Sequence, residues 1–380
     1  MPVGLELTFQ QPVARSTSGR ALYRLYRRLI GQLKRLVRWE FWPPYVFYPP
    51  VIAYIVYLGL RFRSFTLFTA ANPAMPAGGF VGESKHEILK HLSNGHPKNA
   101  GSFLPLSMLL PKGTPDDRLE EAQAFMRKHQ LGFPIFLKPD AGQRGSGVAV
   151  VRSSQQLREY LSRVSSSTIV QEYVPGREFG VFYVRYPEEK HGRIFSVTEK
   201  RMPVVVGDGS RTVEELILAD DRAVCMADYY LRNNSERTQD VPVPGERVQL
   251  VEIGTHCRGA IFLDGSYGKT PALEETIDRI AGKFGGFFFG RFDIRVPTVE
   301  DFMSGQNLKV IELNGVTSEA THIYDPKLSL IDAYRVLFEQ WRMAFEIGHR
   351  NREQGVRPSS LMELMRTIRD YRQLAGEYPQ

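Results

Sequence analysis

Two apolar segments in the second half of the chain carry charged or polar side chains at alternate positions, and they restrict the fold more than any other feature. The segments are Phe287–Val296 (FFFGRFDIRV) and Leu308–Gly315 (LKVIELNG). Their length and their aromatic and β-branched content predict buried strands. Because side chains alternate between the faces of a strand, Asp293 lies opposite the apolar face, and Glu312 and Asn314 share one face. Adjacent strands would bring these three side chains together.

A cluster of Asp293, Glu312 and Asn314 predicts a magnesium site. Hard oxygen ligands on rigid strands suit Mg²⁺ that bridges nucleotide phosphates, and one carboxylate often lies between two such ions. Arg291 and Arg295 share the face of Asp293 and are candidates for contact with an anionic substrate. The alternative is a surface ladder of Arg and Asp salt bridges. The apolar surroundings disfavour it, because acidic residues seldom interrupt such runs without a function.

A glycine-rich loop further upstream predicts phosphate binding. Residues Lys138–Val148 (KPDAGQRGSGV) place a lysine at the end of one strand and glycines before the next. Glycine lets backbone N–H groups approach phosphate oxygens without a Cβ clash, and the lysine adds a positive charge. A plain β-turn would explain the glycines equally well, so the prediction depends on the rest of the chain. The loop residues concerned are Gly142, Arg144, Gly145, Ser146 and Gly147.

A second segment, Ile169–Val181 (IVQEYVPGREFGV), predicts an adenine-binding hinge. Two strand-like pieces flank a Pro-Gly turn. Backbone groups there could face an adenine edge, while Glu178 could accept hydrogen bonds from ribose hydroxyls. Taken one at a time, Glu172 and Glu178 would be interpreted as ordinary exposed strand residues. The hinge residues are Gln171, Glu172, Tyr173 and Val174.

Together these motifs resemble the ATP-grasp superfamily, and specifically its D-alanine-D-alanine ligase-like carboxylate-amine ligases. The resemblance covers roughly Glu83 to Gly348 and rests on several motifs in a fixed order. It implies an α+β fold, the ATP-grasp fold, in which two α+β subdomains clamp ATP. It also implies ATP and two Mg²⁺ ions as cofactors, with Mn²⁺ as a substitute.

The resemblance also implies roles for single residues on the phosphate side. Lys138 would hold the α and β phosphates, and Lys85, in GESKHEIL, would be the earlier lysine. Arg258 would stabilise the transferred phosphoryl group. The segment Glu199–Ile217 is similar to one in cyanophycin synthetases and related amino-acid ligases, so Lys200 and Arg201 would also face phosphate. A solvated strand end is the alternative for the last two.

The acceptor side departs from the D-alanine ligases. Those ligases continue after the metal-binding asparagine with a Pro-Gly turn and a serine, whereas this chain reads GVTSEATHIYDP. The dipeptide D-alanyl-D-alanine is therefore not implied. The acceptor-side candidates are Thr317, Ser318, Glu319, Thr321, His322 and Tyr324, of which His322 could equally be structural. Asn72, in the loop AANPAMPAGGF, could line the carboxylate pocket or belong to a structural turn.

The formal net charge of +7 is concentrated in an N-terminal arm, since residues 15–38 contain basic but no acidic side chains. Leucines at three- and four-residue spacings from Leu22 to Leu36 predict an amphipathic helix over Gly19–Arg38. Such a helix could lie on an anionic membrane, or pack on the enzyme's own body or a dimer partner. Phe41–Leu60 is uncharged, but its prolines leave only Val51–Leu60 as an unbroken helix, too short to cross a bilayer.

We expect four regions: a basic, aromatic and Pro-rich arm (1–63), a shortened pre-ATP-grasp region (64–112), the ATP-grasp domain (113–348) and a helical tail (349–380). Within the second region, SFTLFTAAN from Ser64 reads as a strand, and Pro105–Asp117 as a linker. Two cysteines and no secretory signal favour the cytoplasm, with membrane association left open. Nucleic acid is an improbable partner, because the basic residues lie in one arm.

The expected reaction activates a small-molecule carboxylate as an acyl phosphate and couples it to an amine, with release of ADP and phosphate. A first alternative is phosphate transfer to a stable acceptor, as in a kinase. A second is a membrane-associated nucleotide-binding protein without catalytic activity. The retained lysines and acids argue against the second.

Overall fold

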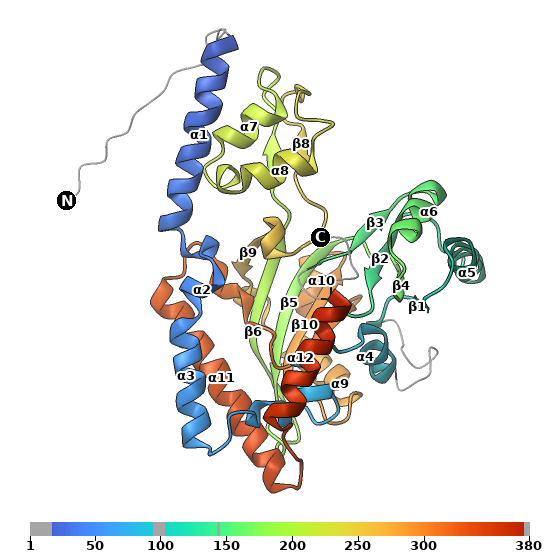
Figure 1. Ribbon diagram of the computed structural model, residues 1–380, viewed down its shortest axis with the longest axis vertical. Coiled ribbons are helices and arrows are strands. Elements are labelled where there is room, and N and C mark those ends of the chain that lie inside the picture. Colours follow the sequence, from blue (N-terminus) through green and yellow to red (C-terminus); the bar gives the residue numbers. More distant parts are fainter. Residues whose placement is uncertain (1–16, 94–102, 143–144, 376–380) are drawn as a thin grey trace, which may run out of the picture. The chain divides into compact units, whose positions relative to one another are not determined.

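The computed structural model describes residues 17–93, 103–142 and 145–375. Helices and strands are interleaved along these residues, so the predicted α+β class is confirmed (Figure 1). The chain forms two compact units. The smaller unit combines the chain up to Trp42 with Pro203–Leu250, and the larger combines Pro43–Met202 with the chain from Val251 onward.

The smaller unit is built on the predicted amphipathic helix. Its elements are α1 (Thr17–Val37), β7 (Val204–Val206), α7 (Val213–Ala219), α8 (Ala227–Asn233) and β8 (Arg247–Gln249). α7 begins with a capping box, in which Thr212 and Glu215 bond each other's backbone N–H groups. Residues 203–250 thus interrupt the expected domain 113–348, and the expected arm 1–63 is divided after Trp42. Local patterns cannot reveal this grouping, because it depends on which distant segments pack together.

The larger unit contains two antiparallel sheets, with strand orders β1-β4-β2-β3 and β11-β10-β5-β6-β9. The first sheet consists of β1 (Ser107–Leu110), β2 (Ile135–Pro139), β3 (Ala149–Val151) and β4 (Thr168–Glu172). The second consists of β5 (Arg177–Val184), β6 (Arg193–Arg201), β9 (Ile261–Asp264), β10 (Phe289–Val296) and β11 (Lys309–Asn314). The strands predicted over Phe287–Val296 and Leu308–Gly315 are present as β10 and β11.

Helices cover both sheets. They are α2 (Pro44–Phe47), α3 (Pro49–Arg61), α4 (Lys85–Leu92), α5 (Pro115–Lys128), α6 (Ser154–Arg163), α9 (Pro271–Gly282), α10 (Val299–Ser304), α11 (Leu330–Glu353) and α12 (Leu361–Ala375). α5 and α6 form one apolar core with the first sheet. α4 and α9 pack on one face of the second sheet, and α3, α11 and α12 on the other. The face that carries α3 and α11 continues past Phe182 and Phe289 into a row of charged side chains, which form the site described below.

The N-terminal part of this unit differs from two expectations. The run from Ser64, predicted as a strand, contains a 3₁₀ helix over Leu67–Ala70. All four of its residues are buried, and Asn351 of α11 donates a hydrogen bond to the Ala70 carbonyl at 2.8 Å, so a helix rather than a strand satisfies this backbone. The predicted linker Pro105–Asp117 contains β1, which pairs with β4, and the start of α5.

The Pro-rich segment before them is helical over most of its length. α3 begins at Pro49, two residues before the predicted Val51, because proline needs no hydrogen-bonded N–H in the first turn of a helix. Over the residues that the structure describes, no helix combines the length and apolar character needed to cross a membrane.

Candidate active site

Two strands of the second sheet, β10 and β11, align the predicted metal ligands. β10 pairs with β11 so that Asp293 lies directly across from Glu312, and Arg291 from Asn314. On its other side, β10 pairs with β5, where Gly180 faces Asp293. The adjacency and the shared face predicted from the two apolar segments are therefore confirmed. A Cβ atom on Gly180 would lie 3.1 Å from Cδ of Arg291, so this glycine leaves room for the charged side chains.

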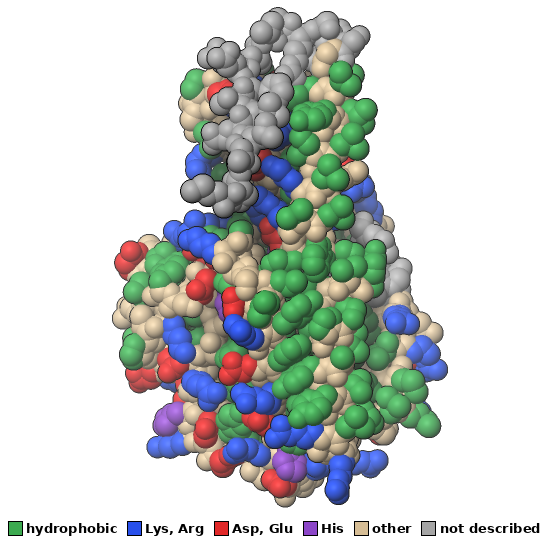
Figure 2. All heavy atoms as spheres, turned by 90° about the vertical axis from the view of Figure 1, so that its left-hand side faces the viewer, with side chains coloured by type: hydrophobic (Ala, Val, Ile, Leu, Met, Phe, Trp, Pro, Cys, Tyr) green, Lys and Arg blue, Asp and Glu red, His purple; other side chains and the backbone are tan. Residues whose placement is uncertain are grey.

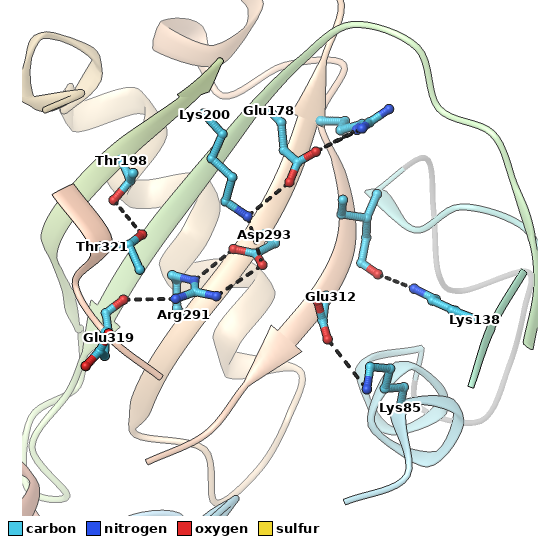
Figure 3. A network of polar contacts seen from close by, with 12 residues as sticks. Lys85, Lys138, Glu178, Thr198, Lys200, Arg291, Asp293, Glu312, Glu319 and Thr321 are labelled. Carbon is cyan, nitrogen blue, oxygen red and sulfur yellow. Dashed lines mark hydrogen bonds and ion pairs between the residues drawn. The ribbon is translucent and has the colours of Figure 1, made fainter. Parts of the chain in front are cut away.

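Lys200 joins two buried carboxylates on this face (Figure 3). Its Nζ lies 3.0 Å from Oε1 of Glu178 and 3.1 Å from Oδ2 of Asp293. Burial alone would lower the pKa of Lys200, but the charges of Asp293 and Glu178 outweigh it and raise that pKa. All three groups therefore stay ionised at neutral pH.

Arg291 holds the other side of Asp293. Its Nε donates to Oδ1 of Asp293 at 2.8 Å, and its Nη1 donates to the backbone carbonyl of Glu319 at 3.0 Å. Burial would raise the pKa of Asp293, but Arg291 and Lys200 outweigh it and lower the pKa to about 2. Asp293 is thus a permanently charged carboxylate that is oriented by two cations.

Glu178 is also fixed by two cations. Besides Lys200, it accepts from Nη2 of Arg295 at 2.9 Å, and Arg295 donates onward to the Val174 carbonyl at 2.9 Å. Burial raises the pKa of Glu178, but Lys200 and Arg295 reverse this effect and lower it. Glu178, expected to contact a ribose, is therefore part of the same ion network as Asp293.

Lys138 and Lys85 approach β11 from the phosphate side. Nζ of Lys138 donates to the Ile311 carbonyl at 2.8 Å, and Nζ of Lys85 lies 3.7 Å from Oε1 of Glu312 (Figure 3). Lys85 also donates to the carbonyl of Gly142, at the start of the glycine loop. Burial lowers the pKa of Lys138 to about 8, although the charge of Glu312 opposes it. The two lysines predicted to bind phosphate thus converge near one metal-ligand candidate.

Two buried amides beside these groups have unused donors. Among the described residues, neither Nδ2 of Asn314 nor Nε2 of Gln171 has a hydrogen-bond partner. Buried polar groups are normally bonded, so unpartnered ones mark positions where a ligand can complete the contacts. Asn314 shares a face with Glu312, and Gln171 lies in the predicted adenine hinge. In that hinge, Tyr173 stacks on Phe136 with ring centroids 5.2 Å apart.

Arg144, one of the predicted loop residues, lies outside the described residues. Gly142 before it and Gly145, Ser146 and Gly147 after it are described. Gly145 and Gly147 have φ values of +75° and +69°, a conformation that glycine adopts without strain. The hydroxyl of Tyr160 donates to the Gly147 carbonyl at 2.7 Å and supports the end of the loop. Ser146 lies between the two glycines.

The acceptor-side candidates surround the other end of the charged row. Oγ1 of Thr321 donates to Thr198 at 3.1 Å, and Oγ1 of Thr317 donates to the Phe80 carbonyl at 3.0 Å. Burial lowers the pKa of His322, which favours the neutral imidazole. Its Nδ1 has no partner among the described residues. The hydroxyl of Ser318 is used locally, since it donates to the Gly315 carbonyl.

Two predicted site residues, Arg201 and Asn72, lie away from this cluster or are otherwise occupied. Arg201 follows Lys200 on β6 and therefore faces the opposite side of the sheet, where it donates to both oxygens of Glu199. Asn72 uses its amide in hydrogen bonds with the backbone of Gly78, Phe288 and Phe289, which is a structural role.

Arg258 and Glu172 complete the candidates. Arg258 lies in a 3₁₀ turn over His256–Arg258, and its side chain makes no ion pair with the described residues. Glu172 accepts from the Leu106 N–H at 2.9 Å, so it ties β4 to the start of β1.

Two further residues at this site, Tyr48 and Glu83, were not predicted from the sequence. The hydroxyl of Tyr48, between α2 and α3, donates to Oε1 of Glu319 at 2.5 Å, and that of Tyr324 donates to Oε2 at 3.1 Å. Burial raises the pKa of Glu83, and its Oε2 has no partner among the described residues. Tyr48 belongs to a segment that reads as an arm, and no local pattern places it near residue 319.

Part of the chain is similar to a known protein family. Residues 109–182 match the family of RimK-like ATP-grasp domains. This part of the chain is therefore similar to part of an ATP-grasp domain. A cyanophycin synthetase from Nostoc sp. is 35% identical over 115 residues, which are 28% of this chain and 12% of that protein. The glutathione biosynthesis bifunctional protein GshAB of Streptococcus agalactiae is 22% identical over 205 residues, which are 48% of this chain and 26% of that protein.

A solved structure of D-alanine--D-alanine ligase from Bacillus anthracis superposes with a TM-score of 0.39 at 16% identity, over 72% of this chain and 69% of that one. The chain spans about an eighth to a quarter of the curated relatives above. The ATP-grasp match includes Lys138, the glycine loop and the hinge. Asp293, Glu312 and Asn314 lie beyond it, so their roles rest on the strand register.

The position of Lys200 leads to a stability prediction. Lys200→Met removes the cation shared by Glu178 and Asp293 and leaves two buried carboxylates close together, so we expect a loss of about 3 kcal/mol in the free energy of unfolding. Chemical denaturation of the protein without ligands measures this loss. The matched control, Lys190→Met, changes an exposed lysine and should cost less than about 0.5 kcal/mol. Adding Glu178→Gln to Lys200→Met should recover part of the loss, and equal stability of Lys200→Met and the wild type would contradict the assigned ion network.

Proposed function

We propose that the protein is an ATP-dependent ligase that activates a carboxylate as an acyl phosphate and couples it to an amine, with release of ADP and phosphate. One observation carries the proposal: two carboxylates in facing register, Asp293 and Glu312, lie among lysines on the same sheet face. The ATP-grasp match and the likeness to ligating enzymes over part of the chain support it.

ATP would bind among the charged residues that the two sheets of the larger unit carry. Lys85 and Lys138 supply positive charge for the phosphates, and the positive-φ glycines of the loop free backbone N–H groups for them. Gln171 offers an unused buried donor for the adenine. Although burial lowers the pKa of Lys138 to about 8, its ammonium group is still mostly charged at neutral pH, where it can neutralise phosphate.

The residues present also fit magnesium. Asp293 and Glu312 offer carboxylate oxygens across one strand pair, and the amide of Asn314 lies on the same face. Within the described ranges, no group of three His, Cys, Asp or Glu side chains forms a metal site by itself, so phosphate oxygens would complete the coordination. When bound, magnesium would neutralise charge on the transferred phosphoryl group. Mn²⁺ could replace it.

The chain's own side chains would position the reactants. Arg291, held between Asp293 and the Glu319 carbonyl, faces the place where the acyl phosphate and then the tetrahedral intermediate develop negative charge. Lys200 contributes a second fixed charge. Thr317, Thr321 and His322 border the acceptor side, where the amine would enter. A carboxylate oxygen bonds to the γ phosphorus while the bond from that phosphorus to ADP breaks and ADP leaves. The amine nitrogen then bonds to the acyl carbon, phosphate leaves with the carbon–oxygen bond, and the proton lost by the amine passes to phosphate or water.

The test is ADP and phosphate release by the purified protein with MgATP, across pools of amino acids, small peptides and hydroxy acids, with mass spectrometry of each mixture. We expect one pool to stimulate ADP release and to yield a mass equal to two components less water. A phosphorylated product without a ligated one would instead identify a kinase. Binding of ATP without stimulated turnover in any pool would favour a non-catalytic role or a lipid-linked acceptor.

A further inference from the structure

Two helices near the N-terminus, α1 and α3, leave apolar side chains uncovered. On α1 of the smaller unit, Leu22, Leu33 and Leu36 are 62–69% exposed, and on α3 of the larger unit Ile52 and Leu60 are 57% and 65% exposed. Further exposed apolar residues on these helices and on α2 are Leu25, Leu29, Val37, Tyr45, Val46, Val56 and Tyr57. Figure 2 shows such side chains gathered over the part of the larger unit that carries α3, with Lys and Arg side chains along the lower border. Monomeric soluble proteins rarely expose patches of this kind without a partner.

The polar face of α1 is already occupied within its own unit. Arg24 pairs with Glu214 at 2.6 Å, Lys34 pairs with Asp221 at 2.5 Å, and Arg27 donates to the Leu218 carbonyl at 2.6 Å. Gly31 lies so close that a Cβ atom there would be 2.4 Å from the Val224 carbonyl oxygen. The sequence left open which surface α1 covers, and the structure places its basic face on acidic residues of the same unit. Its leucines therefore face away from that unit.

Like α1, α3 has one side that packs on its own unit and one side that is exposed. Val51, Leu58 and Gly59 are buried, and α3 packs against α11. The opposite side of the helix carries only uncharged residues. Between residues 41 and 82 the sequence has no acidic residue, and the two basic ones, Arg61 and Arg63, follow directly at the end of the exposed face. The two arginines at the end of this face therefore have no acidic partner within their own segment of the sequence.

We propose that the exposed face of α1 and, separately, the exposed face of α2 with α3 each bind the surface of an anionic lipid bilayer, with each helix parallel to that surface. An uncharged face bordered by arginines suits acyl chains beneath anionic headgroups, and tyrosines such as Tyr45 and Tyr57 are favoured at that depth. Neither helix has the length and apolar character to cross a bilayer.

The test is flotation of the full-length protein with phosphatidylcholine vesicles, with and without phosphatidylserine, in the absence of nucleotide. We expect the protein to float with the anionic vesicles, to float less with the neutral ones, and to be released by added salt. Ile52→Ser, Val56→Ser and Leu60→Ser together, or Leu25→Ser, Leu29→Ser and Leu33→Ser together, should each lower the bound fraction at least about tenfold. Val241→Ser with Val243→Ser, two exposed apolar residues outside these helices, is the matched control and should bind like the wild type.

Three outcomes would overturn the proposal. They are failure of the wild type to float with any vesicle, retention of binding by both triple variants, and a concentration-dependent dimer without vesicles that the same substitutions abolish. Since the substituted side chains are exposed, the variants should keep the wild-type melting temperature. Single substitutions, Leu60→Ser and Leu29→Ser, replace any triple variant that does not. The assay uses no ATP, so its result is independent of the ligase proposal.

Discussion

Asp293→Asn is expected to lower the turnover of MgATP at least about 10³-fold, which corresponds to roughly 4 kcal/mol of transition-state stabilisation. The substitution keeps the size of the side chain but removes the charge that faces Glu312 across β10 and β11. Glu312→Gln should have a comparable effect, because both carboxylates would contact the ion that neutralises the transferred phosphoryl group. The measurement is the initial rate of ADP release over a range of magnesium concentrations.

The control for this exchange is Asp116→Asn, on an exposed carboxylate of α5 that pairs only loosely with Arg158 at 3.4 Å. It should leave the rate within twofold of the wild type, as expected of an exposed pair. Because Asp293 also pairs with Lys200 and Arg291, the melting temperature of Asp293→Asn must be compared with that of the wild type at the assay temperature. A folded Asp293→Asn variant with unchanged magnesium-dependent turnover would exclude the assigned metal site.

The affinity for ATP should fall as the pH rises above 8. Burial lowers the pKa of Lys138 to about 8, so the free protein loses this proton in mildly alkaline solution. Bound phosphates would stabilise the charged ammonium and raise its pKa, so binding above pH 8 requires uptake of a proton. Affinity should therefore be constant up to about pH 8 and then weaken by up to about tenfold per pH unit until the pKa of the complex is reached. Calorimetry with MgATP from pH 7 to about 9.5 measures the profile.

Lys138→Arg tests the assignment of this profile. Arginine keeps its charge throughout the range, so the variant should bind ATP with a flat pH dependence, even if its different geometry weakens binding overall. Lys190→Arg, at an exposed position, should keep the wild-type profile. A wild-type profile that is flat through pH 9, or one that Lys138→Arg leaves unchanged, would remove Lys138 from the phosphate site.

The alternation of side chains along β10 and β11 was enough to predict which residues share a face. It could not predict their ion pairs, because Lys200 reaches Asp293 from β6, across β5. The same rule, applied to Lys200 and Arg201 together, shows that consecutive strand residues cannot both face one ligand. The resemblance offered both, and the strand separates them.

The N-terminal part was less predictable for a different reason. α1 could be read from its leucine spacing, but its packing on acidic residues near 214–228 depends on contacts distant in the sequence. The run from Ser64 reads as a strand from its composition, yet α11 encloses it and satisfies part of its backbone. Local propensity is overridden where a buried segment meets a helix instead of a strand edge.

The hydroxyl of Tyr48 ends a short polar chain that runs through Glu319 and Arg291 to Asp293. Tyr48 lies between α2 and α3, so this chain begins in the segment whose outer side we assign to lipid. If docking shifts Tyr48, thermodynamic linkage requires the effect to be mutual: substrates that favour one arrangement of Glu319 must change the partition of the protein onto vesicles by the same factor by which vesicles change their affinity. Attachment to a membrane would then change the affinity of the site for its substrates, as an allosteric effector does. Binding of substrates would in turn change how much of the protein is attached to the membrane.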